Sequence, residues 1–283
     1  MGELDAFEGH RIVPADLPLW SLQGLEKPRR RPIHSMTMKF LVCISKAPDT
    51  TSRIAFTEGD TQFDANGVQF IVNPYDEWYA LVRALELKEQ HGGTVTTITV
   101  GQPDCDPVIR KALAIGADDA IRVDANPTDA MQVAGLIAEQ AKAGGYDVVL
   151  CGKETIDHNG SVVGGMLAEM LDASFISLAT SLDLEGGKAQ AKREASGGLE
   201  RVEATLPVVV SAAKGMAEQR IPNMRGIMAA RTKPLNVVTP GGATEGTGVS
   251  KFELPPAKGD CKLISADTPE ELVRLLREEA KVL

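Results

Sequence analysis

The sequence has 283 residues, of which 43% are hydrophobic and 24% charged, the composition of an ordinary globular protein. A chain of this length can bury a core as one large domain with appendages. The formal net charge of -9 is spread along the chain, which argues against a nucleic-acid partner because phosphate backbones require a concentrated basic face. No apolar run approaches the ~20 residues needed to cross a bilayer, and the N-terminus lacks a secretory pattern, so we expect no membrane insertion.

The four cysteines are far apart and show neither the spacing of a zinc site nor that of a disulfide framework. Cys43 and Cys151 lie inside apolar runs, so we expect both to be buried as small hydrophobic residues. We therefore predict no metal site, and this cysteine usage indicates a reducing, cytoplasmic location.

Residues 1–37 differ from the rest of the chain. They contain four prolines and show no periodicity, which predicts an irregular N-terminal extension. The basic stretch Lys27–Arg31 is either a solvated linker or a contact for an acidic partner. We expect residues 38–240 to form the folded domain and residues 241–283 to form a C-terminal arm and helix. Translation starting at Met38 is an alternative, since the first convincing strand begins there.

From Met38 onward, short runs of Val, Ile and Leu alternate with segments of helical period, which is typical of a parallel sheet built from βαβ units. The predicted elements are strands Lys39–Ser45, Thr94–Val100, Ala120–Val123 and Asp147–Cys151, and helices Asp76–His91, Pro107–Ile115, Asp129–Ala143 and Ser161–Leu171. Right-handed crossovers between these strands give an α/β fold with a doubly wound, mostly parallel sheet. Arg53–Thr57 and Val68–Val72 flank an Asn66-Gly67 turn signal, which predicts an inserted hairpin.

The second half of the chain is richer in strands. The predicted strands are Ile176–Leu182, Gln190–Glu194 and Leu199–Thr205, joined by Gly-Gly turns. The segment Met216–Lys233 has no clean period and four basic residues, which predicts an exposed basic loop running into a short helix. A C-terminal helical arm begins at Pro269, with Thr268 and Glu271 in capping-box register.

The loop Gly152–Val163, which follows the strand Asp147–Cys151, is the predicted ligand site. Ligands of open α/β sheets bind beyond the carboxyl ends of the strands. The N-terminus of the helix that follows offers free N–H groups and a positive dipole to a phosphate. Gly160, Ser161, Gly164 and Gly165 are small enough to let the backbone approach a diphosphate closely. The sequence therefore predicts a phosphate cradle.

This loop matches neither a Walker A motif nor a GxGxxG motif, so the sequence does not support nucleotide hydrolysis. Asp157 and His158 are an apparent acid/base pair. Adjacent side chains seldom aim at the same atom, and no pattern places a Ser or Cys nucleophile beside them. We predict no catalytic residue and expect this pair to orient a ligand or hold the loop.

Five segments together resemble a known family. They are Gly152–Asp157 (Gly-Lys-x-x-Ile-Asp), Asn73–Asp76, Arg110–Asp118, Arg193–Glu200 and Arg225–Arg231. They resemble, in the same chain order, segments of the electron-transfer flavoprotein beta subunit. Each is weak alone, but the resemblance runs from Met38 to the C-terminus.

The resemblance implies an adenine nucleotide at the end of the sheet, which is AMP or, in electron-bifurcating members, a second FAD. We expect AMP. The positions that match the nucleotide site are Cys43, Asn73, Pro74, Tyr75, Asp76, Val100, Gly152, Lys153, Glu154, Thr155, Ile156, Asp157, His158, Asn159, Gly160, Ser161, Val162 and Val163. Asn73-Pro74 is also a plain strand-to-helix turn. Many members carry acidic and Gln residues where this chain has His158–Val163, which leaves the choice between AMP and FAD open.

The resemblance also implies partners. An alpha subunit would hold most of a shared FAD, and electrons would pass from acyl-CoA-type flavin dehydrogenases of fatty acid β-oxidation to a quinone oxidoreductase or another acceptor. Met216–Arg231 resembles the loop that docks on dehydrogenases, with Met224 as its apolar anchor beside Arg225. Glu194 matches a carboxylate that pairs with the alpha subunit, and a solvent-facing charge is its alternative interpretation. The chain would then be an electron-carrier subunit that turns over no substrate of its own.

Two other functions stay open. In an electron-bifurcating flavoprotein, the second FAD would be reduced by NADH. A stand-alone adenine-nucleotide-binding regulatory module would need no alpha subunit.

Overall fold

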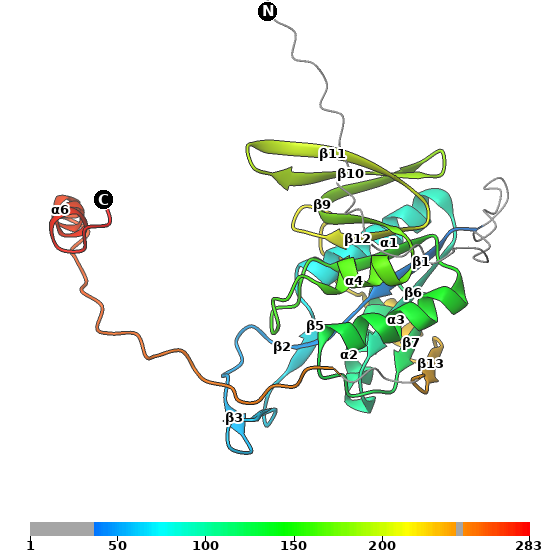
Figure 1. Cartoon of the computed structure of the whole chain (residues 1–283), viewed down its shortest axis with the longest axis horizontal. Helices are drawn as coiled ribbons and strands as arrows, with labels where there is room; N and C mark the ends of the chain where they lie inside the picture. The colour runs from blue at the N-terminus through cyan, green and yellow to red at the C-terminus, as the bar shows by residue number, and fades with distance from the viewer. Residues whose placement is uncertain (1–36, 242–245) are drawn as a thin grey trace, which may run out of the picture. The chain divides into compact units, whose positions relative to one another are not determined.

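A computed structural model describes residues 37–241 and 246–283 (Figure 1). The strands of its main sheet are β1 (Lys39–Cys43), β6 (Thr94–Val100), β7 (Asp119–Val123), β8 (Val148–Gly152), β9 (Ser174–Glu185), β10 (Lys188–Ala195), β11 (Gly198–Thr205), β12 (Val208–Ala212) and β13 (Leu235–Val238). The helices are α1 (Asp76–His91), the 3-10 helix η1 (Pro103–Cys105), α2 (Asp106–Ile115), α3 (Ala130–Gly144), α4 (Val163–Met170), α5 (Met224–Ala230) and α6 (Pro269–Glu278). The predicted N-terminal extension lies outside the described residues, except for Thr37.

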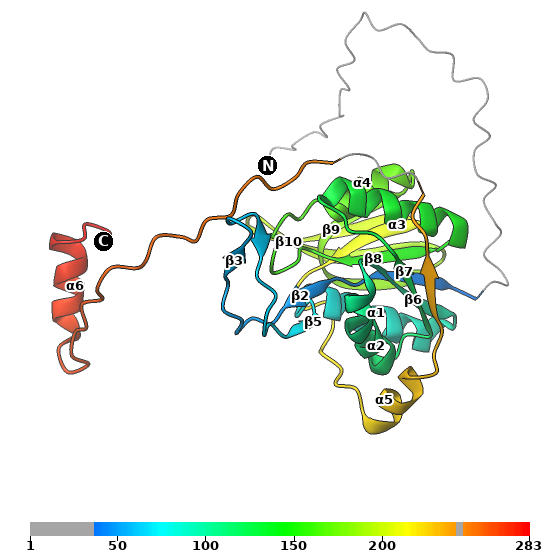
Figure 2. The same ribbon diagram turned by 90° about the horizontal axis from the view of Figure 1, so that it is seen from below.

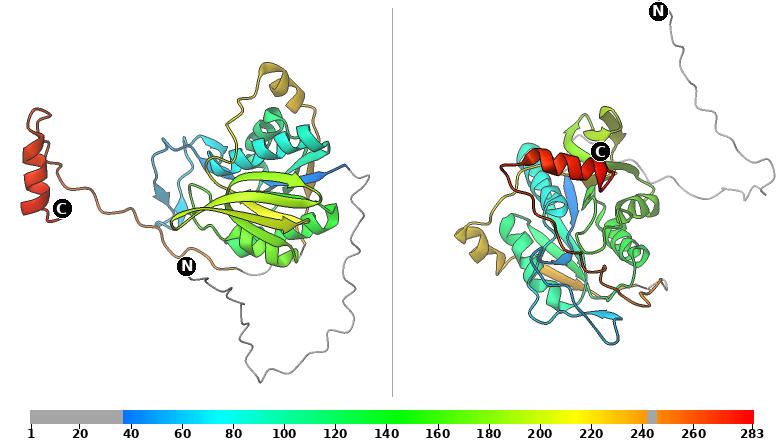
Figure 3. Two further views of the ribbon diagram at one scale, coloured as in Figure 1. Left: turned by 90° about the horizontal axis from the view of Figure 1, so that it is seen from above. Right: turned by 90° about the vertical axis from the view of Figure 1, so that its left-hand side faces the viewer.

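Among the described residues, the nine strands form one sheet in the order β11-β10-β9-β12-β8-β1-β6-β7-β13. The pairs β9–β10 and β10–β11 are antiparallel, and the other neighbours are parallel. The mostly parallel α/β sheet predicted from the sequence is therefore confirmed. The antiparallel strands β9–β11 extend from one edge of the sheet (Figure 3).

Two cores cover the two faces of the sheet. Along β1, Phe40 and Val42 pack in the core that contains α1 and α2, whereas Leu41 and Cys43 pack in the core that contains α3 and α4. Figure 2 shows α1 and α2 on one side of the sheet and α3 and α4 on the other. A strand covered on both faces is apolar at nearly every position, which is why these strands can be recognised in the sequence.

The order of the strands reverses beside β1. The chain runs from β1 through α1 to β6 and through α2 to β7, and then returns through α3 to β8 on the opposite side of β1. Consecutive crossovers therefore diverge at the carboxyl ends of β1 and β8. Open α/β sheets bind their ligands at such a point.

Two strands of the main sheet, β12 and the edge strand β13, were not predicted from the sequence. Every residue of β12 is buried, and this strand pairs in parallel with both β8 and β9. The run Val208–Val210 is only three residues long before Ser211 interrupts it, too short for its pattern to identify a strand. Parallel pairing with β8 and β9 makes this segment a strand.

The predicted hairpin was wrong in its pairing. The short strands are β2 (Lys46–Pro48), which pairs with β5 (Phe70–Val72), and β3 (Phe56–Thr57), which pairs with β4 (Gln62–Phe63). The Asn66-Gly67 turn is present, with the Val68 N–H bonded to the Ala65 carbonyl at 3.2 Å, but it joins β4 to β5. The tight turn between paired strands contains Glu58, Gly59 and Asp60, all with positive φ. The Asn66-Gly67 turn therefore does not connect two strands that pair with each other.

The C-terminal segment carries α6, in which no residue is buried. The predicted capping box is absent, because the Thr268 hydroxyl donates to the Ser265 carbonyl at 3.4 Å and caps no helical N–H. Upstream, the Phe252 ring stacks on Phe56 with centroids 4.9 Å apart, and the Phe252 N–H donates to the Asp60 carbonyl at 2.7 Å. The segment thus returns to the β3–β4 hairpin. In the described part of the chain, no helix combines the length and the apolar character required to cross a membrane.

Replacing Leu150 by Ala tests the core. Leu150 is fully buried in β8, so the substitution removes buried methyl groups and leaves a cavity. We expect the free energy of unfolding to fall by about 2–5 kcal/mol, measured by urea denaturation. The matched control is Leu263→Ala, whose side chain is 88% exposed and should change stability by no more than about 0.5 kcal/mol. Equal losses in the two variants would contradict the burial of β8.

Candidate functional site

A cavity of about 580 Å³ lies where the order of the strands reverses. It is lined by residues at or just beyond the carboxyl ends of β1, β6, β7 and β8. Cys43 and Cys151, both buried, belong to its wall, and the loop Gly152–Val163 provides another part. The volume is within the range of about 300–1,000 Å³ that small-molecule sites occupy.

Most of the residues predicted from the sequence meet at this cavity. Those that line it are Cys43, Val100, Gly152, Lys153, Glu154, Thr155, Asp157, His158, Gly160, Ser161, Val162 and Val163. Asn73, Pro74, Tyr75, Asp76, Ile156 and Asn159 do not line it. Asn73 is hydrogen-bonded to the loop Gly152–Val163, which forms part of the cavity wall.

The sequence analysis missed several lining residues. They are Ile44, Ser45, Lys46, Glu77, Ile98, Gly101, Gln102, Asp104, Cys105, the segment Asn126–Ala130, Val133, Ile137 and Cys151. Many directly follow β1, β6 or β7. Ligands of open sheets bind beyond the strand ends, and this rule covers the loops after β1, β6 and β7 as well as the loop after β8.

Asn73 ties the loop to the body of the domain. Its side chain is fully buried, its Nδ2 donates to the Glu154 carbonyl at 3.0 Å, and its Oδ1 accepts from the Ile156 N–H at 3.0 Å. Because one partner is an acceptor and the other a donor, only this orientation of the amide satisfies both. Asn73 therefore holds the loop in place from the N-terminal side of α1.

Gly152 allows α1 to approach the end of β8. A Cβ atom at this position would lie 2.8 Å from Cγ of Glu77 and 3.0 Å from the Glu77 backbone nitrogen. Any larger residue would push α1 away from the sheet. The requirement for glycine at the start of the loop is thus steric.

The loop ends at the N-terminus of α4. No side chain caps this helix at Val162, and Val163 is its first residue. The first N–H groups of a helix have no partner within the helix, and they carry the positive end of its dipole. Gly160, Ser161 and Val162 line the cavity beside this helix terminus, and the phosphate cradle stays a prediction.

The charged side chains of the loop pair with one another. Lys153 Nζ lies 2.9 Å from Glu154 Oε1, and the Ser161 hydroxyl donates to Glu154 Oε2 at 2.9 Å. The hydrogen bond to Glu154 raises the pKa of Lys153, and the same contact lowers the pKa of Glu154. Both groups stay charged at neutral pH, so they give this part of the wall little net charge.

Asp157 and His158 do not form a hydrogen-bonded pair. Their nearest charged atoms, Oδ2 and Nε2, are 3.8 Å apart, and the His158 side chain is 84% exposed. A general base needs a partner within hydrogen-bond reach. The geometry gives no support to acid/base catalysis by these two residues.

Glu77 is a buried carboxyl group in the cavity wall, 5% exposed. Its Oε2 accepts from the backbone N–H of Ser45 at 2.8 Å and from the Ser45 hydroxyl at 2.9 Å. Burial raises the pKa of Glu77 to about 8, against the two hydrogen bonds from Ser45, and the nearby carboxylates of Asp157 and Asp76 raise it further. The carboxyl group is thus largely neutral at pH 7.

Comparison with known proteins identifies the family. The family model named electron transfer flavoprotein domain matches residues 60–241. The electron transfer flavoprotein subunit beta of Bacillus subtilis (strain 168) is 36% identical over 261 residues, covering 87% of this chain and 100% of that protein. The chain belongs to the electron transfer flavoprotein beta subunit family. The proteins of that name from Syntrophomonas wolfei (35% identical over 248 residues) and Homo sapiens (32% over 255) each match 87% of this chain and 97% and 99% of their own lengths.

The residues predicted to contact partner proteins lie on two separate elements, α5 and β10. Met224, 73% exposed, and Arg225, also exposed, begin α5, whereas the exposed Glu194 lies on β10. No contact joins Glu194 to the other two. The sequence analysis did not single out Ile221, whose side chain is 87% exposed just before α5.

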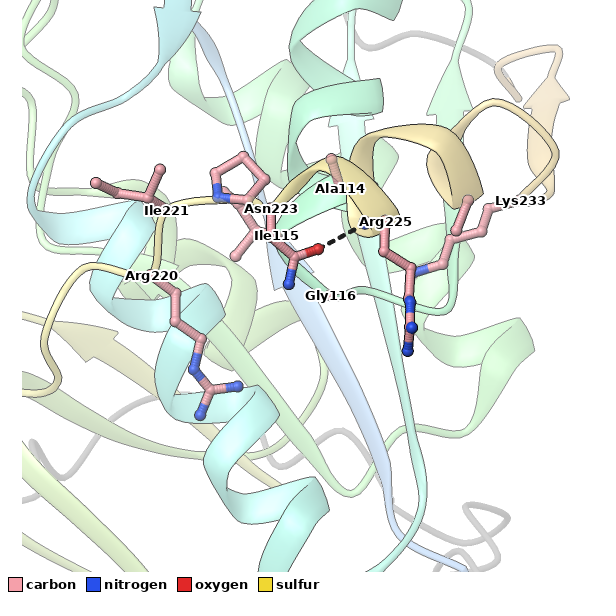
Figure 4. A pocket seen from close by; sticks show the side chains of 11 residues that line it. Ala114, Ile115, Gly116, Arg220, Ile221, Asn223, Arg225 and Lys233 are labelled. Atoms are coloured by element: carbon pink, nitrogen blue, oxygen red, sulfur yellow. Dashed lines mark hydrogen bonds between the residues drawn. The ribbon is translucent and has the colours of Figure 1, made fainter.

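A second pocket, of about 510 Å³, lies between the end of α2 and α5 (Figure 4). Asn223 caps α5 there by accepting from the Gly226 N–H at 2.9 Å. The predicted exposed basic loop was partly wrong, because Arg220 pairs with Glu89 at 2.6 Å and Lys233 donates to the Leu113 carbonyl at 2.9 Å. These two cations anchor the segment to α1 and α2.

Replacing Asn73 by Ala should loosen the loop. The Ile156 N–H and the Glu154 carbonyl would lose their partner, so we expect the free energy of unfolding to fall by about 1–3 kcal/mol. Hydrogen exchange at Ile156 should become faster. Asn66→Ala, which removes a hydrogen bond between exposed side chains, is the control and should leave both measurements nearly unchanged. Unchanged exchange at Ile156 in the Asn73 variant would rule out the tether.

Glu77 should make stability depend on pH. The unfolded carboxyl titrates near 4.5 and the folded one near 8, so between these values the folded state holds a proton that the unfolded state has released. Stability should therefore fall as pH rises from about 5 to 8, by up to about 1.4 kcal/mol per pH unit, and level off above 8. Glu77→Gln should flatten this decline in denaturation series across pH, and Glu86→Gln on the same helix should keep it. A decline that persists in the Glu77 variant would refute the assignment.

Proposed function

We propose that the protein is the beta subunit of a heterodimeric electron transfer flavoprotein and that it binds AMP in the cavity at the ends of β1, β6, β7 and β8. The observation that carries the proposal is the uncapped N-terminus of α4 beside small loop residues, at the reversal of the strand order. A phosphate is the ligand group that suits such a helix terminus. The cavity volume of about 580 Å³ is within the range of small-molecule sites.

In this proposal, the backbone N–H groups at the start of α4 receive the phosphate, and the loop Gly152–Val163 encloses it. Asn73 keeps the loop in position through its two hydrogen bonds. The walls formed by Cys43, Val100 and Ile137 offer apolar contact to the adenosine part. The nucleotide would stabilise the fold, since a ligand that binds only the folded state favours that state.

A shared FAD, held mainly by an alpha subunit, supplies the redox chemistry when it is bound, and this chain contributes part of the surrounding wall. Electrons would reach this FAD from flavin dehydrogenases and leave it for a quinone oxidoreductase. We propose a cytoplasmic location, which fits the free, buried thiols of Cys43 and Cys151.

We propose that dehydrogenases dock on α5 and the segment before it. Ile221, Met224 and Met228 are 87%, 73% and 64% exposed there, and Arg225 adds a positive charge without an ionic partner among the described residues. Flexible Met side chains suit a surface that must fit several partners. Glu194, on β10, is proposed to contact the alpha subunit.

Identification of the bound nucleotides tests the AMP site. The chain should be co-expressed with the alpha subunit, purified as a complex and denatured, and the released nucleotides identified by mass spectrometry. We expect one AMP and one FAD per heterodimer. Two FAD molecules per heterodimer would contradict the AMP site and support the electron-bifurcating alternative. A stable monomer that carries an adenine nucleotide and never acquires flavin would instead indicate a regulatory module.

Truncation of exposed apolar residues tests the docking surface. Ile221→Ala and Met224→Ala should each weaken binding to a dehydrogenase about 5- to 30-fold, since central contacts contribute about 1–2 kcal/mol. The measurement is the dependence of electron transfer on the concentration of the flavoprotein. Ile54→Ala, at a side chain that is 43% exposed and distant in sequence, is the control. Full activity of both variants at low concentration would exclude this surface.

A further inference from the structure

One carboxyl oxygen of Glu77 forms no hydrogen bond with the described residues. Its Oε2 accepts two hydrogen bonds from Ser45, whereas its Oε1 makes no hydrogen bond or ion pair with any described residue. The side chain is 95% buried, yet the residue lines the cavity. Oε1 keeps some accessible surface, so a ligand in the cavity can reach it.

The surroundings of Glu77 keep it neutral. On β1 and β8 it faces the buried thiols of Cys43 and Cys151, and the charges near it are the carboxylates of Asp157 in the loop and Asp76 on its own helix. No cation pairs with Glu77 among the described residues, because the nearby Lys153 pairs with Glu154 and acts on Asp76. Burial and like charge therefore both favour the protonated carboxyl.

With Oε2 accepting both hydrogen bonds from Ser45, we assign the proton of the neutral carboxyl group to Oε1. Oε2 already accepts the N–H and the hydroxyl of Ser45, and a protonated carboxyl group has only one O–H to donate. Oε1 is therefore a hydrogen-bond donor at the cavity wall. The negative potential of Asp76 and Asp157 disfavours a phosphate at this place, which leaves an uncharged acceptor as the suitable partner.

We propose that Glu77 contacts the nucleotide, donating a hydrogen bond from Oε1 to an uncharged acceptor on the adenosine part, a ring nitrogen or a ribose oxygen. This inference rests on the proposed AMP site and deepens it. The contact exists only while Glu77 holds its proton, so binding is linked to proton uptake. Nucleotide affinity then decreases as the pH rises above the range in which Glu77 is protonated.

The test uses the full chain in its complex with the alpha subunit, freed of nucleotide, and calorimetric titration with AMP between pH 6.5 and 9.5. Above about pH 8, the dissociation constant should rise by up to tenfold per pH unit. The phosphate of AMP, with a second pKa of about 6, is fully charged over most of this range. The dissociation constant of adenosine, which lacks the phosphate, should rise with pH at the same rate. A slope seen with AMP but not with adenosine would overturn the contact to the adenosine part.

Substitution separates Glu77 from other titrating groups. Glu77→Gln keeps a neutral donor, so binding should stay within a few-fold of the wild type at pH 7 and become independent of pH. Glu86→Gln, on the same helix and outside the cavity, should keep the full slope. An unchanged slope in Glu77→Gln, or a flat profile in the wild type, would overturn the inference while leaving the AMP site intact. Failure of the wild type to bind AMP at any pH would overturn both.

A second measurement needs no variant. Titration at pH 8 in two buffers of different ionisation enthalpy gives the number of protons taken up on binding. With Glu77 half ionised in the free protein and protonated in the complex, we expect an uptake of about half a proton. No uptake, or a release of protons, would overturn the inference.

Discussion

The reversal of strand order between β1 and β8 is the constraint on which the rest of the site depends. Because the chain crosses one face of the sheet through α1 and α2 and returns across the other through α3, the loops that leave β1 and β8 diverge. Their divergence opens the cavity. Gly152 then lets α1 approach the end of β8, and Asn73 fixes the loop that follows. One topological feature therefore brings together residues of β1, β6 and β8, of α1, α3 and α4, and of the loops between them.

The electrostatics of the cavity differ from one part to another. At the rim, Lys153, Glu154 and Ser161 neutralise one another, and the uncapped start of α4 offers partial positive charge. Deeper in the wall, Glu77 is buried without a cation, an arrangement that lowers stability. Perturbed carboxyl groups in clefts are frequent at functional sites. The gradient from a phosphate-binding terminus to a neutral acid fits a ligand with one charged end.

The proposed docking surface and the proposed nucleotide cavity share no lining residue among the described residues. The segment before α5 is anchored to α1 by the Arg220–Glu89 pair and by the Trp78 indole, which donates to the Arg220 carbonyl at 3.3 Å. These contacts hold the backbone while leaving Ile221 and Met224 exposed. A rigid support with exposed flexible side chains is suited to several partners. In the proposed function, the nucleotide would stabilise the domain and the dehydrogenases would dock on α5, away from the nucleotide cavity.

Elements whose pattern is continuous could be predicted from the sequence alone. The bounds of α1 and β6 agree residue for residue with their predictions, because a helix of sixteen residues with one apolar stripe and a strand covered on both faces leave little ambiguity. The loop Gly152–Val163 was found because it directly follows such a strand. The motifs also identified the family, since they keep their order along the chain.

Features that depend on contacts between distant segments could not be predicted and appear only in the folded structure. It made β12 a central strand from five residues, and it paired β2 with β5 although the local Asn66-Gly67 signal favoured another hairpin. It also carried Glu77, an unremarkable acidic residue in the first turn of a helix, to the end of β1 beneath the loop after β8. Local patterns record the periodicity of a single element, whereas burial of a charge depends on which elements pack around it.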